Sequence, residues 1–131
     1  MADLRLVLVT PEKTLFDREV ESVSVPMFDG STGIYPHRAP LVGRLGFGEL
    51  TLRFGGGSEC YFIEGGFVQV KGLQVSVLTS SAVPVGDLTV EAGKAAMEEA
   101  KAEKGSTDAA IESREQKLDR ARKMITIARR N

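Results

Sequence analysis

The sequence has no tryptophan, one cysteine and one histidine, and it lacks any run of about 20 apolar residues that could span a membrane. Cys60 has no second cysteine with which to form an intrachain disulfide, and one cysteine with one histidine cannot supply the ligands of a common zinc site. The first residues show no basic flank followed by an apolar segment. These absences favour a reduced, cytoplasmic setting and indicate neither secretion nor membrane spanning.

The composition is that of a folded protein, with 42% hydrophobic and 27% charged residues in a chain of 131. This length fits one modest domain with an appendage. The net charge of -1 excludes a general affinity for nucleic acid, but its distribution is uneven. Residues 108–131 hold seven basic and four acidic residues, so the C-terminal end is locally cationic.

The first 86 residues have the pattern of short β-strands. Leu4, Leu6 and Leu8 alternate with their neighbours at the period of two that is typical of half-buried strands. Similar runs occur at residues 21–25, 49–54, 60–63, 67–71 and 75–79. Turn-forming pairs lie between them, at residues 29–30, 55–57, 65–66 and 71–72. We therefore expect residues 1–86 to form an antiparallel β-sandwich of about ten strands.

The remaining residues, 87–131, are expected to form an antiparallel hairpin of two helices. Strong helix formers dominate residues 90–104 and 109–130. Between them, Gly105 is placed to end the first helix, and Thr107 or Asp108 is placed to cap the second. The apolar stripe of the first helix is mostly small, and Gly93 within it weakens the helix by about 1 kcal/mol. The hairpin is thus expected to attach loosely to the sandwich.

Residues that could perform chemistry are scarce. His37 is the only histidine, and it lies in a turn-rich segment without a nucleophile or a paired carboxylate beside it. The glycine clusters lack the strand, loop and helix context of a phosphate-binding loop. We expect a protein that is not an enzyme and needs no metal.

Several segments resemble the epsilon subunits of F-type ATP synthases. The stretch at 29–41, DGSTGIYPHRAPL, resembles the family signature G-x-x-G-I-Y/L-P-x-H-A-P-L, although Arg38 stands where the family has His and His37 precedes it. The segments VTP and LFD at 9–17, EGGFVQV at 64–70 and VSVL at 75–78 follow in the family order. The resemblance implies a non-catalytic rotor subunit that couples proton translocation to ATP synthesis and sits at the cytoplasmic face of the bacterial plasma membrane. It associates with the membrane only through the complex.

The resemblance also implies three partners. The sandwich would bind the gamma subunit, and one loop would rest on the ring of c subunits. That contact loop comprises Ser31, Ile34, Tyr35, Pro36, His37, Arg38, Ala39, Pro40 and Leu41. The hairpin would extend to the catalytic beta subunits and inhibit ATP hydrolysis through its basic residues, which are Arg114, Arg120, Arg122, Lys123, Arg129 and Arg130. These residues could instead be solvated helix positions that complement the helix dipole.

Some bacterial members of the family bind ATP through a motif that opens the first helix, a hydrophobic residue followed by Asp-x-x-Arg-Ala. The aligned segment here, VEAGKA at 90–95, keeps the signs of the charges with Glu91 and Lys94. Lysine lacks the planar guanidinium of arginine, so the resemblance implies either a weakened regulatory ATP site or no cofactor.

The sequence leaves open an alternative function of a different kind. A β-sandwich with a helical hairpin could be a free-standing binding module whose hairpin mediates oligomerisation. Such a module would form a stable complex without other ATP synthase subunits, whereas the epsilon reading predicts copurification with gamma.

Overall fold

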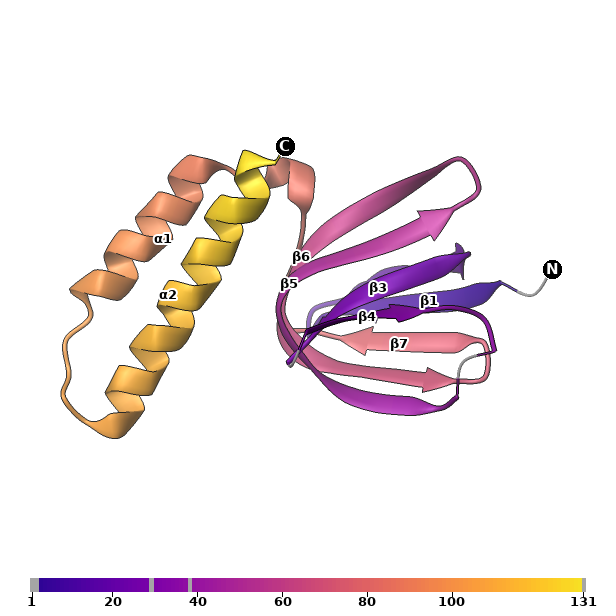
Figure 1. Ribbon diagram of the computed structural model, residues 1–131, viewed down its shortest axis with the longest axis horizontal. Coiled ribbons are helices and arrows are strands. Elements are labelled where there is room, and N and C mark those ends of the chain that lie inside the picture. Colours follow the sequence, from indigo (N-terminus) through magenta and orange to yellow (C-terminus); the bar gives the residue numbers. More distant parts are fainter. Residues whose placement is uncertain (1–2, 29, 38, 131) are drawn as a thin grey trace. The chain divides into compact units, whose positions relative to one another are not determined.

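The computed structural model describes residues 3–28, 30–37 and 39–130. It divides into two compact units, Met1–Pro84 and Val85–Asn131. The first is built from strands and the second from helices (Figure 1). The first unit ends at Pro84, whereas the sequence placed the boundary after Gly86. The difference arises because a 3-10 turn, η1 (Val85–Asp87), directly follows the last strand.

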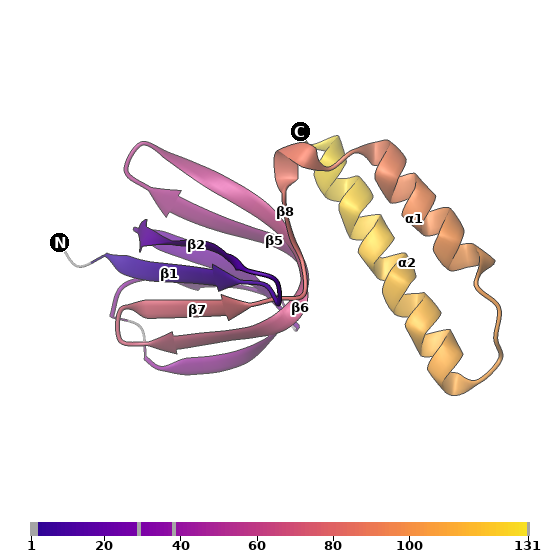
Figure 2. The same cartoon turned by 180° about the vertical axis from the view of Figure 1, so that it is seen from behind.

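Eight strands of the described residues form one sheet, in the order β2-β1-β7-β6-β5-β3-β4, with β8 paired to β6. The strands are β1 Leu4–Val9, β2 Thr14–Val20, β3 Ser22–Met27, β4 Gly30–Ile34, β5 Leu41–Phe54, β6 Gly57–Lys71, β7 Gln74–Leu78 and β8 Ala82–Pro84. Viewed from behind, β2, β1, β7 and β6 run side by side (Figure 2). Every pair is antiparallel except β1 with β7, which are parallel. This exception is allowed because a long connection separates these two strands in the sequence.

The sandwich arises because β5 and β6 are long enough to take part in two layers. The N-terminal half of β5 pairs with the C-terminal half of β6, which continues to β7, β1 and β2. The other halves pair with each other and with β3 and β8. The structure has eight strands where about ten were expected, because β5 and β6 each run through both layers as one strand. The predicted β-sandwich is therefore confirmed.

The core lies between the two layers. One layer contributes Leu4, Leu6 and Leu8 from β1, and the other contributes Leu50 and Leu52 from β5, all 0% exposed. The alternation seen in the sequence thus marks the inward faces of both strands. At about 25 cal/mol per Å² of buried apolar surface, this cluster is the main stabilising element of the sandwich.

The glycine pair at 65–66 does not form the expected turn between strands. Gly65 and Gly66 lie inside β6, with φ angles of +69° and +110°. A Cβ at Gly66 would stand 1.9 Å from the carbonyl oxygen of Leu78, so only glycine fits where β6 meets the end of β7. The pair therefore lets one long strand pass from layer to layer. In contrast, residues 55–56 do form a hairpin turn, between β5 and β6.

The second unit is the expected pair of helices, α1 (Val90–Ala102) and α2 (Asp108–Arg129), which lie side by side (Figure 1). The side chain of Thr107, and not that of Asp108, caps α2 by accepting a hydrogen bond of 3.1 Å from the Ala110 N–H. Thr89 caps α1 in the same way.

The two helices approach each other closely at Gly93. This residue is buried, and a Cβ added to it would stand 2.6 Å from Cγ1 of Ile125 and 3.2 Å from the Ile125 backbone nitrogen. Gly93 was expected only to weaken α1. The structure shows that the missing side chain is what admits α2. At the other end of the hairpin, Ile111 remains 40% exposed, so the apolar seam is tight at Ile125 and open at Ile111.

Candidate interaction surfaces

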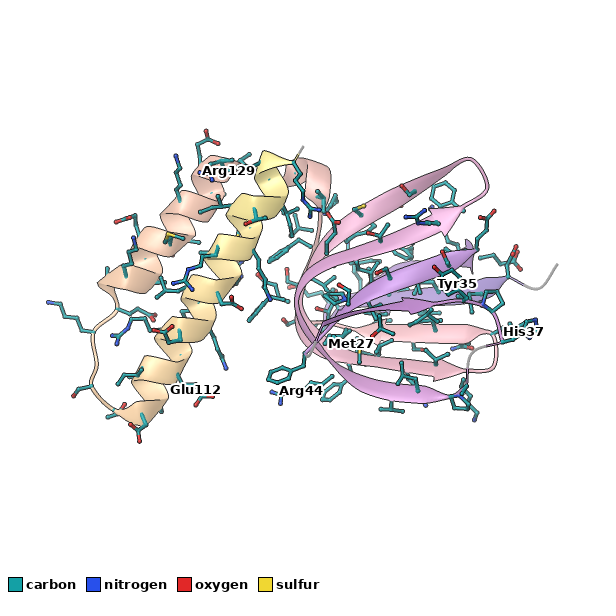
Figure 3. All side chains as sticks on the ribbon, viewed as in Figure 1. Met27, Tyr35, His37, Arg44, Glu112 and Arg129 are labelled. Carbon is teal, nitrogen blue, oxygen red and sulfur yellow. The ribbon has the colours of Figure 1, made fainter. Side chains whose placement is uncertain are left out.

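The predicted contact loop, residues 35–40, connects β4 to β5 at one end of the sandwich. Tyr35 is 65% exposed, and its ring lies over Gly33, where an added Cβ would be 3.2 Å from ring atom Cε2. His37 is exposed and has a φ of +70°, the only positive value among described residues other than glycine. Figure 3 shows Tyr35 and His37 at the same end of the sandwich.

The ends of this loop are anchored in the core. Ile34 closes β4 and is 0% exposed, while Leu41 opens β5 and packs against the core cluster. These two predicted contact residues therefore hold the loop in place, Ile34 from within the core and Leu41 as a half-buried residue packed against it. Ser31 in β4, Ala39 and Pro40 are exposed, and Pro36 is half-buried. Arg38 lies outside the described residues.

A second exposed surface was not predicted from the sequence. It lies on the outer face of the layer formed by β5, β6, β7 and β1, where Arg44 pairs with Phe67, Phe67 pairs with Leu78, and Leu78 pairs with Val9. Phe28 extends this row, because its N–H donates to the Arg44 carbonyl at 2.9 Å. We call Phe28, Arg44, Phe67, Leu78 and Val9 the outer row.

The outer row exposes an unusual amount of apolar surface. Phe28 is 73% exposed, Phe67 59% and Leu78 53%, so three large side chains lie in water along one line. Beside Leu78, a groove of about 290 Å³ is lined by Val9, Thr10, Pro11, Leu78, Thr79 and Ser80. A contiguous apolar surface of this kind marks a site of protein–protein interaction.

A signal for the outer row was present in the sequence. Phe67 alternates with Val68 and therefore shares a face with Gln69 and Lys71, which are polar. Leu78 likewise falls on the side of Ser76. A large apolar residue on the polar face of a strand is a departure from alternation, but only the strand pairing places these residues next to each other.

The predicted inhibitory residues lie along α2 in differing environments. Arg122, Lys123, Arg129 and Arg130 are exposed. Lys123 pairs with Asp119 one turn earlier, at 3.5 Å between Nζ and Oδ2. Arg120 is half-buried. The exposed charges could meet a partner without rearrangement of the hairpin.

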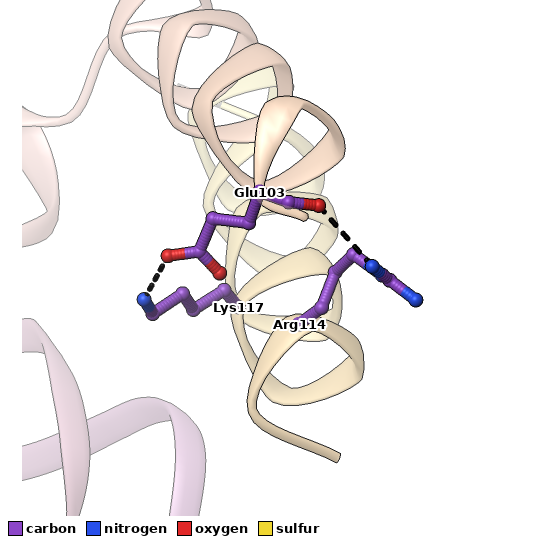
Figure 4. A network of polar contacts seen from close by, with 3 residues as sticks. All are labelled: Glu103, Arg114 and Lys117. Carbon is purple, nitrogen blue, oxygen red and sulfur yellow. Dashed lines mark hydrogen bonds and ion pairs between the residues drawn. The ribbon is translucent and has the colours of Figure 1, made fainter. Parts of the chain in front are cut away.

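Arg114 has a role within the hairpin itself. Its guanidinium donates a hydrogen bond of 3.1 Å to the carbonyl of Glu103, the residue that caps the C-terminal end of α1. Lys117 pairs with the Glu103 carboxylate, so two basic residues of α2 hold the end of α1 (Figure 4). The hairpin cannot open at this end without breaking both contacts.

Glu91 and Lys94, the residues of the predicted ATP site, are exposed in the first turns of α1. They are three residues apart and share one side of the helix. The groove of about 310 Å³ between the helices is lined by other residues, namely Ala96, Glu99, Ala100, Glu103, Lys117 and Arg120.

In the strand unit, the half-buried side chain of Arg18 lies near two aromatic rings. Its guanidinium lies 4.5 Å from the ring centroid of Phe54 and 5.9 Å from that of Phe16, and it pairs with Glu59 at 3.3 Å. Burial, with a smaller contribution from the negative charge of Glu59, raises the pKa of the Tyr61 phenol. Tyr61 therefore stays protonated at neutral pH.

Metal and membrane sites were sought over the described ranges. Residues 3–28, 30–37 and 39–130 contain no group of three His, Cys, Asp or Glu side chains that could hold a metal ion. Within the same ranges no helix is long and apolar enough to cross a membrane.

Comparison with known proteins identifies the family. The family model described as "ATP synthase, Delta/Epsilon chain, beta-sandwich domain" matches residues 3–85. An ATP synthase epsilon chain from Rhodopirellula baltica is 41% identical over 126 residues, which cover 96% of this chain and 98% of the relative. The chain belongs to the ATP synthase epsilon family. The family predicted from the sequence motifs is thereby confirmed, and the alternative of a free-standing binding module is set aside.

Other relatives agree with this assignment. A sodium ion specific epsilon chain from Propionigenium modestum is 35% identical over 101 residues, or 77% of this chain and 74% of that one. Among solved structures, a chain of the Euglena gracilis mitochondrial ATP synthase superposes with a TM-score of 0.85 at 25% identity, covering 96% of this chain and 81% of that chain. A chain of the Tetrahymena thermophila enzyme has the same fold, with a TM-score of 0.80 at 16% identity and 96% coverage of both chains. As an epsilon-type chain, the protein is a non-catalytic subunit of the membrane-bound ATP synthase.

Proposed function

We propose that this chain works in the rotor of an F-type ATP synthase, where it links the gamma subunit to the ring of c subunits and so couples ion translocation to ATP synthesis. Membership of the epsilon family supports this role. The observation that carries the proposal is the exposed outer row, because a chain of this size gains nothing from three large apolar side chains in water unless a partner covers them.

The outer row is the surface proposed to bind gamma. Replacing both Phe67 and Leu78 with glutamine should weaken binding to purified gamma by about 100-fold, since each removes an apolar anchor worth roughly 1–2 kcal/mol at an interface. Surface plasmon resonance with immobilised gamma measures this change. Leu73→Gln is the matched control, because Leu73 is also exposed but lies in the turn between β6 and β7, outside the outer row. Equal affinity of the double variant and the control would reject this surface.

The loop at residues 35–40 is proposed to rest on the c ring. Its two ends, the buried Ile34 and the half-buried Leu41, pack on the core and fix its position, and Pro36 and Pro40 reduce the entropy lost on binding. Figure 3 places Tyr35 and His37 at the opposite end of the sandwich from Arg44, so one subunit can contact two partners at once.

Tyr35→Ala should therefore lower ATP-driven ion pumping in reconstituted vesicles while leaving the affinity for gamma unchanged, because Tyr35 lies outside the outer row. Ion pumping and gamma binding are measured on the same variant. Full pumping by Tyr35→Ala would argue against the loop as the site that contacts the ring.

The hairpin is proposed to inhibit ATP hydrolysis by presenting its basic residues to the beta subunits. Four of these residues are exposed, three on α2 and Arg130 at its C-terminal cap, where complementary charge on a partner would attract them. Deleting residues 85–131 should raise the hydrolysis rate of the assembled complex, because the basic residues of the hairpin are removed. The complex should still assemble, since the strand unit with its interaction surfaces remains. The assay is steady-state hydrolysis at matched subunit content, and an unchanged rate would contradict an inhibitory hairpin.

A site for a regulatory nucleotide on the hairpin is a further part of the proposal. Regulatory ATP would contact Glu91 and Lys94, and calorimetric titration of the full chain with ATP tests this, since an absence of heat at millimolar nucleotide would exclude the site.

The complex would hold the chain peripherally at the cytoplasmic face of the bacterial plasma membrane. Fractionation tests this location, and recovery apart from the membrane-bound gamma subunit would contradict it.

A further inference from the structure

Arg44 is the one charged member of the outer row, and among the described residues its side chain lies against an aromatic ring. Its guanidinium lies 5.1 Å from the ring centroid of Phe28, which is itself exposed. Four ion pairs within the described residues join Arg5 to Asp17, Arg18 to Glu59, Lys117 to Glu103 and Lys123 to Asp119, and Arg44 takes part in none of these four. Figure 3 shows the side chain projecting outward from the sandwich.

In the described part of the chain, the charged side chains that strand alternation places with Arg44 on the outer face of β5, β6 and β7 are basic. On the outer face of β5, β6 and β7, strand alternation gathers Val42, Arg44, Phe67, Gln69, Lys71, Gln74, Ser76 and Leu78. Two of these are basic and none is acidic. On the edge strand β2 of the same layer, Asp17 is already paired with Arg5 at 2.8 Å. This part of the face is therefore both apolar and positively charged.

The stacked position prepares Arg44 to bind a carboxylate. A guanidinium that lies on an aromatic ring keeps its N–H groups at the edge of the plane, where a carboxylate can accept two parallel hydrogen bonds. The neighbouring aromatic rings Phe28 and Phe67 would exclude water from such a pair, which strengthens it. Lysine in the same place would offer charge without this geometry.

We propose that Arg44 binds an acidic side chain of the gamma subunit, set within an apolar strip that covers the outer row. The groove beside Leu78 would take an apolar side chain from the same strip. Three strand spacings separate Arg44 from Val9 at the groove, so the carboxylate and the apolar anchor lie about 14 Å apart. This inference rests on the proposed function, and it adds the residue that gives the interface its charge selectivity.

The test compares Arg44→Gln, Arg44→Lys and Leu78→Gln in the full chain, with affinity for purified gamma measured over a series of NaCl concentrations. Arg44→Gln should bind about tenfold more weakly at low salt and lose most of the salt dependence, because the screened ion pair is gone. Arg44→Lys should keep the salt dependence with part of the affinity lost. Leu78→Gln should weaken binding equally at every salt concentration.

The outcomes separate this inference from the proposed function. Arg44→Gln with the affinity and salt dependence of the unsubstituted chain would overturn the role of Arg44 while leaving the outer row as the gamma surface. Equal weakening by Arg44→Gln at all salt concentrations would also overturn it, since that result describes lost packing alone. If the unsubstituted chain does not bind gamma, the proposed function falls and the inference falls with it. Arg44 and Leu78 are both exposed in the folded chain, and circular dichroism of each variant serves as the control for folding.

Discussion

Gly66→Ala is expected to destabilise the sandwich by about 4 kcal/mol, which for a domain of this size is close to the whole free energy of unfolding. Two costs combine. The φ of +110° is unfavourable for alanine, and the new Cβ would meet the Leu78 carbonyl oxygen at 1.9 Å and the Thr79 Cα at 2.9 Å. Both neighbours are backbone atoms, so the contact is relieved only if β6 and β7 separate.

Gly56→Ala provides the matched control. Its φ of +111° is nearly the same, but no atom lies within 4 Å of the position that a Cβ would take. We expect this variant to lose only about 1 kcal/mol, the cost of the backbone conformation. Urea unfolding followed by tyrosine fluorescence reports on the sandwich alone, because Tyr35 and Tyr61 both lie there. Similar stability of the two variants would show that the close approach at Gly66 is not limiting.

Gly93→Ala is expected to destabilise the helical hairpin by about 1–2 kcal/mol, although helix propensity alone predicts a gain of about 1 kcal/mol. The added methyl group would stand 2.6 Å from Cγ1 of Ile125 and 3.2 Å from its backbone nitrogen. The helices would have to move apart to relieve this contact. Thermal unfolding followed by circular dichroism at 222 nm measures the effect, which has opposite signs under the two explanations.

Ile125→Ala completes a double-mutant cycle with Gly93→Ala. Removing Cγ1 of Ile125 takes away the shorter of the two contacts, so Gly93→Ala should cost less in that background. Additive effects of the two substitutions, or a higher melting temperature for Gly93→Ala alone, would mean that Gly93 acts through helix propensity and not through packing.

The correspondence between sequence and structure was closest where one physical rule dominates. The alternation at Leu4, Leu6 and Leu8 and the stop between the helices predicted the strand and hairpin regions, because burial of one face and capping are local requirements. The contact loop was located by its resemblance to a family signature. The structure then separated its residues into exposed ones, such as Tyr35, and anchors, such as Ile34.

The features that the sequence did not predict depend on contacts between strands that are distant in the chain. Gly65 and Gly66 were expected to form a turn, since glycine pairs commonly do, but whether such a pair ends a strand or bends it depends on the strand that lies opposite. The outer row was missed for the same reason. Phe28, Arg44, Phe67 and Leu78 come from four separate segments, and only the register of β5, β6 and β7 places them in one line.

The sequence by itself determined that this protein has a strand-rich body and a two-helix tail, that it carries a cationic C-terminal helix, and that it belongs to the epsilon family. These properties follow from periodicity, composition and motif order, which are written along the chain. The tertiary structure alone decided which glycines admit a neighbouring backbone, which loop residues face outward, and that Arg44 stands among exposed aromatic residues. Those properties depend on distances between residues far apart in the sequence, and folding is what brings such residues together.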